Sequence, residues 1–303
     1  MDITKAFIKA KQPCADGFRW YLRHADHDST YQDILDALVA AGRVEDACWL
    51  LDQFGPTGAV LAADRIEAHA LVFAGTIEVR GHIEVETVLR AGKTLRAAAG
   101  IVAGNIRAGE DIFCGGAVRS GGDLRTQGLL QAAWGVECAG ALACETLQAG
   151  WDLRCAGAAA IAGSCRVGQS LQARDALVCG KGLQAGGDIE CAGRLRVGHG
   201  IACAGGLRCA DHIYAGWGIK AREDIVADRS IQAGESLACE GEILAGDGYG
   251  IYAGLEVDVE TWDSCACVHA RQRPRALRSG RWAGPLPGSA PAPAIEAARK
   301  EDP

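Results

Sequence analysis

The feature that most constrains this chain is a six-residue repeat of large aliphatic side chains between residues 171 and 243. Every sixth residue in this stretch is Leu or Ile, from Leu171 to Ile243, and a small side chain such as Ala173 or Cys179 follows two positions later. A spacing of two puts both side chains on one face of an extended segment. A period of six fits neither an α-helix nor a simple amphipathic hairpin. The repeat therefore predicts a solenoid.

The same period extends upstream in two more blocks, over residues 71–101 and 106–142, and a third block starts at Leu147. A step of five residues separates neighbouring blocks, and only Ala159 and Cys165 depart from the Leu/Ile/Val rule. If three short strands form one triangular coil, the thirty hexads predict about ten coils. At about 4.8 Å per coil, the rod is roughly 48 Å long. We expect a mainly β, single-stranded triangular β-solenoid over residues 63–254.

The small companion position explains the unusual cysteine content. A narrow coil has room for one large side chain per edge, and overfilling costs about 1–3 kcal/mol per site, so the companion is Ala, Cys or Val. Glycine often follows because corners need backbone conformations that favour it. Of the fourteen cysteines, Cys165 occupies the large aliphatic position. Nine others occupy the companion position: Cys114, Cys138, Cys144, Cys155, Cys179, Cys191, Cys203, Cys209 and Cys239. We expect reduced, buried thiols in a cytoplasmic protein, in preference to disulfides or metal ligands.

Residues 1–62 lack the hexad and have helical patterning. Thr30 and Asp33 have the spacing of a capping box, and Gly42 is suited to end the helix that follows. We expect three or four helices that form an N-terminal α-helical cap over the open end of the solenoid, where strand edges would otherwise be exposed.

The C-terminal part departs from the hexad at residues 247–254. Leu255, Val257 and Val259 alternate with acidic residues as a strand would, so residues 255–284 are expected to form a C-terminal strand cap. Residues 285–303 are rich in Pro and Ala and predict a disordered tail.

Two sets of outward side chains are candidates for binding a partner. Arg90, Arg107 and Arg125 are spaced to lie one coil apart on one face, where they would form a basic strip for an acidic partner or phosphate; alternatively, acids such as Asp111 and Asp123 offset them. Exposed aromatic pairs are suited to anchor interfaces. The second set is a pair of tryptophans, Trp134 and Trp151, which are expected at the same corner of adjacent coils, where they either bind a partner or cover the corner. Trp217 is expected at a different corner.

Signals for catalysis are weak. His82, His199 and His212 fall at or near corners, without a carboxylate or cysteine partner that the sequence places beside them. The Cys265, Cys267 and His269 series lacks the usual zinc spacing and a fourth ligand. Hexapeptide acyltransferases also form triangular solenoids, but in their motif the small residue precedes the aliphatic one by two, whereas here it follows. We expect no catalytic site, no cofactor and no bound metal.

Composition limits the partners further. The formal net charge of −7 disfavours a general nucleic-acid-binding surface. No apolar run is long enough to span a membrane, and the N-terminal residues lack the apolar core of a signal peptide.

The repeated AG-x-x-I units, AGWGIKA at residues 215–221, DGYGIYAGL at residues 247–255 and the leader motifs PCADGFRWYL and DACWLLDQFGPT resemble a group of bacterial Ala/Gly-rich solenoid proteins with a helical leader. That group is similar to immunity partners of polymorphic toxins. The solenoid also resembles bactofilins, cytoskeletal β-helices that polymerise end to end, although bactofilins have short tails in place of a folded leader.

These resemblances imply a function for the chain. Our first hypothesis is a non-catalytic immunity protein that binds a toxin encoded by a neighbouring gene and blocks its active site. The second is a self-assembling scaffold. A third, a carbohydrate-active or acyltransferase enzyme built on the solenoid, is disfavoured by the missing acid/base pairs.

Overall fold

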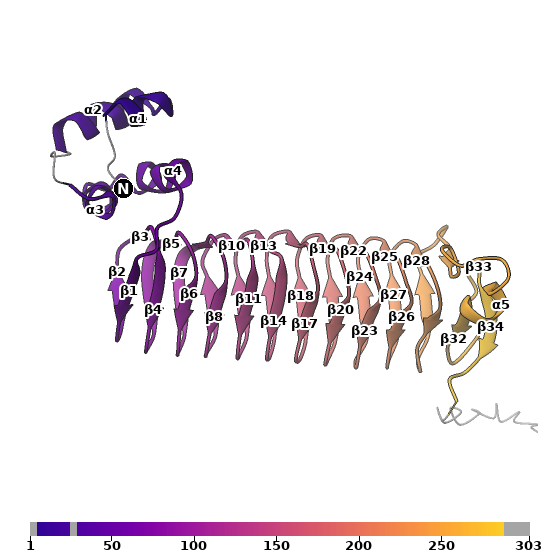
Figure 1. Ribbon diagram of the computed structural model, residues 1–303. Coiled ribbons are helices and arrows are strands. Elements are labelled where there is room, and N and C mark those ends of the chain that lie inside the picture. Colours follow the sequence, from indigo (N-terminus) through magenta and orange to yellow (C-terminus); the bar gives the residue numbers. More distant parts are fainter. Residues whose placement is uncertain (1–4, 25–28, 288–303) are drawn as a thin grey trace, which may run out of the picture.

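The computed structural model describes residues 5–24 and 29–287, and in it a rod of stacked coils carries a helical unit near one end (Figure 1). Each coil passes through three short strands in turn, and every strand pairs in parallel with its counterparts in the coils before and after it. We call the three resulting surfaces face 1, face 2 and face 3. The predicted parallel β-solenoid is confirmed.

The strands of face 1 belong to one thirteen-stranded sheet: β1 (Val60–Ala63), β4 (Thr76–Val79), β6 (Leu95–Ala97), β8 (Ile112–Cys114), β11 (Leu129–Ala132), β14 (Thr146–Ala149), β17 (Cys165–Val167), β20 (Leu183–Ala185), β23 (Ile201–Cys203), β26 (Ile219–Ala221), β29 (Leu237–Ala238), β32 (Cys267–His269) and β34 (Arg281–Gly284).

Face 2 follows in the chain direction: β2 (Ile66–Ala68), the first parts of β5 (Ile83–Ala91) and β7 (Ile101–Ala108), β9 (Val118–Ser120), β12 (Val136–Cys138), β15 (Leu153–Cys155), β18 (Leu171–Ala173), β21 (Ile189–Cys191), β24 (Leu207–Cys209), β27 (Ile225–Ala227) and β30 (Ile243–Ala245).

Face 3 completes each coil: β3 (Leu71–Phe73), the last parts of β5 and β7, β10 (Leu124–Thr126), β13 (Leu142–Cys144), β16 (Ala159–Ile161), β19 (Leu177–Cys179), β22 (Leu195–Val197), β25 (Ile213–Ala215), β28 (Ile231–Ala233), β31 (Ile251–Tyr252) and β33 (Leu277–Ser279).

The rod has about 12 turns, against the ten expected from the hexads. The difference arises at both ends. Strands β1 and β2 precede the first hexad, and β32, β33 and β34 continue the parallel pairing beyond the last one. At the five-residue step between Ile101 and Ile106, β7 has one residue fewer than β5 between face 2 and face 3, and the register between the two strands shifts there.

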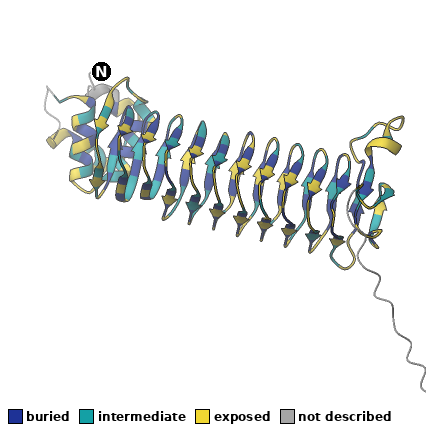
Figure 2. Ribbon diagram, turned by 90° about the horizontal axis from the view of Figure 1, so that it is seen from below, coloured by how far each residue is buried: buried dark blue, intermediate teal, exposed yellow. Residues whose placement is uncertain are grey.

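The hexad positions form the core, as predicted. The large aliphatic residues from Leu171 to Ile243 are at most 2% exposed, and their companions from Ala173 to Cys239 are buried beside them. Figure 2 shows the resulting alternation of buried and exposed residues along the strands. A polar companion also contributes a hydrogen bond. The thiols of Cys179 and Cys209 donate to the carbonyl oxygens of Gly163 and Gly193 in the preceding coil, at 3.1 and 3.0 Å. The hydroxyl of Ser120 occupies the same position and donates to the carbonyl oxygen of Gly104 in the preceding coil at 3.3 Å. Cysteine at this position therefore fills space and satisfies a corner carbonyl.

The corners are held by side-chain oxygens that bond to the next coil, and we call this contact a corner clamp. In each clamp, the residue just before the large aliphatic accepts a hydrogen bond from the backbone N–H that lies 18 residues later. The acceptors are Asn105, Asp111, Asp123, Asp188 and Asp224, at 2.7–2.9 Å. Because a clamped backbone N–H is satisfied without a strand partner at the bend, the clamp stabilises the stacking of corners.

In each of the five short clamps, the residue 17 positions after the acceptor is glycine. A Cβ atom built at Gly205 would lie 2.1 Å from the Asp188 oxygen, and one at Gly241 would lie the same distance from the Asp224 oxygen. Where this position is not glycine the clamp is longer. Asp152 faces Gln169 and bonds at 3.2 Å, and His212 faces Arg229 and bonds at 3.3 Å.

The N-terminal helices are α1 (Lys5–Ala10), α2 (Ala15–His24), α3 (Tyr31–Ala40) and α4 (Val44–Phe54). The Thr30–Asp33 capping box at the start of α3 is confirmed, and Gly42 follows the end of α3 with φ of 71°. These helices lie against the flank of the first coils and not across the end of the rod as expected (Figure 1). The reason is that the apolar stripes of α3 and α4 pack on Val72 and Ala74 beside β3.

The C-terminal part differs from its prediction in one segment. Residues 255–261 form turns, and Val259 is 92% exposed, so the strand expected from Leu255 to Val259 is wrong. The chain leaves the coil at Gly254, whose φ of 76° turns it outward, and a short helix, α5 (Trp262–Cys265), follows. Strands β32, β33 and β34 lie within residues 255–284. The tail expected over residues 285–303 lies outside the described residues from 288 onward.

Candidate functional site, an exposed tryptophan pair

Trp134 and Trp151 lie at the corner between face 1 and face 2 in adjacent coils, as the register predicted. The backbone N–H of Trp151 donates to the carbonyl oxygen of Trp134 at 3.1 Å. The two indole rings stack with centroids 6.0 Å apart and an angle of 21° between their planes. Trp134 is 57% exposed and Trp151 is 61% exposed. An aromatic pair of this size that remains in water is unusual on a monomer surface and is typical of binding sites.

The corner before this pair has small side chains, and a glutamine follows the pair. The same backbone hydrogen-bond column that joins the tryptophans passes through Ala99 and Gly116 before them and through Gln169 and Gly187 after them. These four neighbouring positions of the column hold no other aromatic side chain. The two indoles are the largest side chains in this part of the corner.

Charged side chains border the tryptophan pair on face 2. Glu137 pairs with Arg119 at 3.2 Å and with Arg154 at 3.8 Å, and Arg154 also pairs with Asp152 at 3.2 Å. The same arginines and Glu137 line an open groove of about 670 Å³ along this face. An apolar centre with a charged border is the arrangement found in protein–protein interfaces.

The three predicted arginines do lie one coil apart on face 3. Arg107 is the register partner of both Arg90 and Arg125. Their environments differ, however. Arg90 is directed to the helical unit, where its guanidinium bonds to the Asp52 carboxylate at 2.7 Å and its side chain is only 15% exposed. Arg90 therefore docks α4 on the solenoid and is not open to a partner.

Arg125 is more accessible, with 52% of its side chain exposed, whereas Arg107 is only partly exposed. Arg125 pairs with Asp123 at 2.8 Å, as one alternative expected, whereas the Asp111 carboxylate is used in a corner clamp. Within the described ranges, Arg107 has no ion-pair partner. The basic strip thus reduces to Arg107 and Arg125.

Trp217 lies at the corner between face 3 and face 1, so the expectation of a different corner is confirmed. Its ring stacks on His199 of the preceding coil, with centroids 4.1 Å apart and planes within 1°. Trp217 is 52% exposed. It is a second exposed aromatic site, with one indole in place of two.

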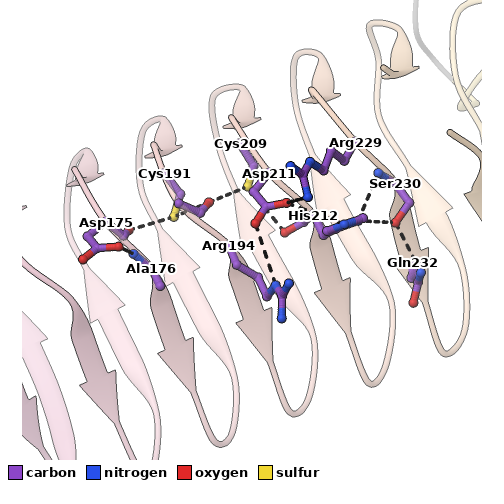
Figure 3. Close-up of polar contacts among 11 residues, drawn as sticks. Asp175, Ala176, Cys191, Arg194, Cys209, Asp211, His212, Arg229, Ser230 and Gln232 are labelled. Carbon is purple, nitrogen blue, oxygen red and sulfur yellow. Dashed lines mark hydrogen bonds and ion pairs between the residues drawn. The ribbon is translucent and has the colours of Figure 1, made fainter. Parts of the chain in front are cut away.

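The sequence missed a polar cluster at the corner between face 2 and face 3 (Figure 3). Asp211 lies within 3.4 Å of Arg229, 3.6 Å of His212 and 3.9 Å of Arg194. His212 Nδ1 lies 2.7 Å from the hydroxyl of Ser230 and accepts the Ser230 backbone N–H at 3.3 Å. The spacing of 18 residues between His212 and Ser230 was the signal that would have placed them together.

This cluster contains a carboxylate, an imidazole and a hydroxyl, but Ser230 is only 5% exposed. The hydroxyl also accepts a hydrogen bond from the Gln232 side chain at 3.2 Å. Because the imidazole occupies the place that an aspartate has in other corners, its role in the structure is that of a corner clamp.

Two further findings concern metals and membranes. In residues 5–24 and 29–287, no group of three or more His, Cys, Asp or Glu side chains is placed to hold a metal ion. Cys265 lies in α5 and Cys267 in β32, where its thiol donates to the Ser264 carbonyl oxygen at 3.2 Å. In the same part of the chain, no helix is long and apolar enough to cross a membrane.

The fold and this surface define the chain as a parallel β-solenoid protein with a helical unit docked on its flank. A family model described as the YdhT N-terminal domain matches residues 1–54, which are the helical unit. No curated protein and no solved structure matches the chain. The match thus concerns the helices alone, and the resemblances to immunity proteins and to bactofilins have no support from these comparisons.

Proposed function

We propose that this chain is a non-catalytic binding protein that recognises another protein through the Trp134–Trp151 corner. The observation that supports this proposal most is the stacked pair of indoles, each more than half exposed, at one corner of the rod. Tryptophan is the residue type most enriched among side chains that dominate binding energy. A charged border of Arg119, Glu137 and Arg154 supplies the surrounding polar contacts.

The rod also favours binding through preorganisation. The coils that carry Trp134 and Trp151 are joined to both neighbours by parallel backbone hydrogen bonds, and Asp152 clamps the next coil, so we expect the corner to change little when a partner binds. Less conformational entropy is then lost on association, and more of the contact energy appears as affinity.

We further propose that the partner is a toxin encoded by a neighbouring gene, which this protein neutralises in the cytoplasm. The support is the resemblance of the leader and closing motifs to immunity proteins. The fourteen cysteines are all free thiols, which suits a reducing compartment.

The test is binding to the product of the adjacent gene, with Trp134→Ala/Trp151→Ala as the variant and Trp217→Ala as the matched control. Loss of both anchor rings should weaken the complex by about 2 kcal/mol or more, roughly thirty-fold in Kd. The control, which removes an equally exposed indole from another corner, should bind within about two-fold of the wild type. If the wild type neither binds this product nor protects cells that express it, the immunity role is excluded.

A self-assembling scaffold is the second candidate, and the first coil favours it. Strands β1 and β2 each have a pairing partner on one side only, and their inward residues Leu61 and Ile66 are only partly buried. An edge of this kind is a template for pairing with a second copy. Size-exclusion chromatography with light scattering at rising concentration should then show growing assemblies. A monomer at every concentration would remove this candidate.

A further inference from the structure

The most basic segment of this acidic chain lies near its C-terminal end. Five arginines fall between residues 271 and 281, and no Asp or Glu occurs from residue 264 to residue 287. The chain as a whole has a formal net charge of −7. The segment joins β32 to β33 and then enters β34, so the solenoid end holds it in place.

A groove of about 510 Å³ lies between this segment and the glycine-rich turn that follows β30. Arg273, Arg275 and Arg278 line one side. Leu244 and Tyr249 line the other and are 48% and 40% exposed. The two sides of the groove come into close contact at Gly250, where an added Cβ atom would lie 2.8 Å from Cγ of Arg278.

All three groove arginines are exposed. Within the described part of the chain, their guanidinium groups make no ion pair and no hydrogen bond. Arg281, in contrast, donates to the Asp263 carbonyl oxygen and to Cys267 Sγ. The nearby Arg229 is held by Asp211, as Figure 3 shows.

The groove also contains two carboxylates, those of Glu242 and Asp247. Neither lies within ion-pair distance of an arginine in the described part of the structure, so three guanidinium groups face two carboxylates. The backbone N–H groups of Asp247 and Gly248 add two donors, since neither bonds to another described residue. The groove therefore offers an excess of donors and positive charge beside an apolar wall.

We propose that this groove binds an acidic peptide segment of a partner protein. The carboxylates of the segment would lie on Arg273, Arg275 and Arg278, since a guanidinium group matches a carboxylate with two parallel hydrogen bonds. An apolar side chain of the segment would lie against Leu244 and Tyr249, a surface that a simple inorganic anion would not use. This site does not depend on the tryptophan corner, because it uses other residues in other coils.

The experiment measures the fluorescence anisotropy of a labelled peptide, Glu-Glu-Leu-Glu-Glu-Tyr-Glu-Glu, titrated with the full chain. The wild type should bind it, and sodium chloride should weaken binding because these charges are exposed. Arg273→Glu/Arg275→Glu should raise the Kd about ten-fold or more. Arg166→Glu, which makes a charge change of the same sign on face 1 outside the groove, should leave the Kd within about two-fold.

Two controls separate the alternatives. Arg273→Gln/Arg275→Gln removes the charges without reversing them and should raise the Kd about five-fold with unchanged circular dichroism. If the groove variants bind the peptide as the wild type does, the site is excluded. If pyrophosphate displaces the peptide and binds more tightly by calorimetry, the groove is a phosphate site and the peptide assignment is wrong. Neither result bears on Trp134 or Trp151, whose test uses a different partner and different variants.

Discussion

At a corner of this solenoid, a carboxylate accepts a backbone hydrogen bond that has no strand partner. Asp123 accepts the backbone N–H of Ala141 in the next coil at 2.9 Å, and its other oxygen pairs with Arg125. The hydrogen bond from Ala141 is the largest cause that lowers the pKa of Asp123 below its ordinary value, and the nearby arginines lower it further. The ionised form is therefore the one that the folded chain favours.

The pH dependence follows from the sign of this shift. A carboxyl group whose pKa is lower in the folded state stabilises the fold above its unfolded pKa of about 3.9, and this contribution is lost as the pH falls through the folded value. Asp123→Ala should lower the free energy of unfolding at neutral pH by about 1–2 kcal/mol, because a corner N–H loses its acceptor.

Asp123→Asn is the matched control, since Asn105 shows that an amide oxygen also forms the clamp. It should retain most of the stability at neutral pH and remove part of the loss in acid. Urea unfolding at neutral and acidic pH measures both quantities. Equal stability of the Ala and Asn variants would mean that the clamp contributes nothing.

At the same residue scale, the sequence predicted the inward positions well because burial repeats with the period of the coil. Ile213, Ile219 and Ile225 are each at most 1% exposed, as the hexad requires. The role of Arg90 was not predictable in this way. Its partner Asp52 is 38 residues away in a helix, and no periodicity relates the two. Pairs such as His212 and Ser230 were predictable in principle, because they are one coil apart.

Among the elements, the strands of the regular coils were predictable and the packing of the helices was not. Helix α3 begins after Thr30 and ends just before Gly42, as expected, since caps and apolar spacing act locally. Which surface they cover depends on outward residues of the solenoid, and Val72 on β3 has no sequence feature that marks it as a docking position. Gln32 strengthens the docking by bonding through its side chain to the carbonyl oxygen of Val72 and the N–H of Ala74.

Residues 255–261 were predicted to form a strand but form turns. The alternation of Leu255, Val257 and Val259 with acidic residues is a period-two pattern, which favours a strand when a partner edge is available. Here Gly254 leads the chain out of the coil, and the backbone N–H of Thr261 bonds locally to the Asp258 carbonyl oxygen at 3.1 Å. A short pattern without a fixed partner does not determine a strand.

At the scale of the whole molecule, a rod in which each coil contacts only its neighbours should open from its ends. Terminal coils have one neighbour, and local opening costs least where fewest contacts are lost. The cysteines can report on this opening, because ten of the fourteen are buried along the rod, from Cys114 to Cys239. Burial raises the pKa of the Cys203 thiol to about 11, so it is protonated and slow to react at neutral pH.

In the native protein, a maleimide reagent should therefore modify Cys14 and Cys265 first, Cys267 more slowly, and the buried cysteines hardly at all. At a urea concentration below the unfolding midpoint, Cys239 should react faster than Cys179. Cys239 lies next to the last regular coils, whereas Cys179 has complete coils on both sides. Cys114 is expected to remain close to Cys179 in rate, because the helical unit supports the first coils through Asp52 and Arg90.

Peptide mass spectrometry after timed labelling measures each rate, and Cys14→Ser/Cys265→Ser/Cys267→Ser removes the fast background without touching the core. An Asp52→Ala/Arg90→Ala variant in the same background weakens the support at the first coils, so Cys114 should then react faster while Cys179 is unchanged. Equal rates at Cys114, Cys179 and Cys239 in both proteins would show instead that the rod unfolds as one cooperative unit. In that case the parallel backbone hydrogen bonds and the corner clamps would couple the coils more strongly than the nearest-neighbour picture allows.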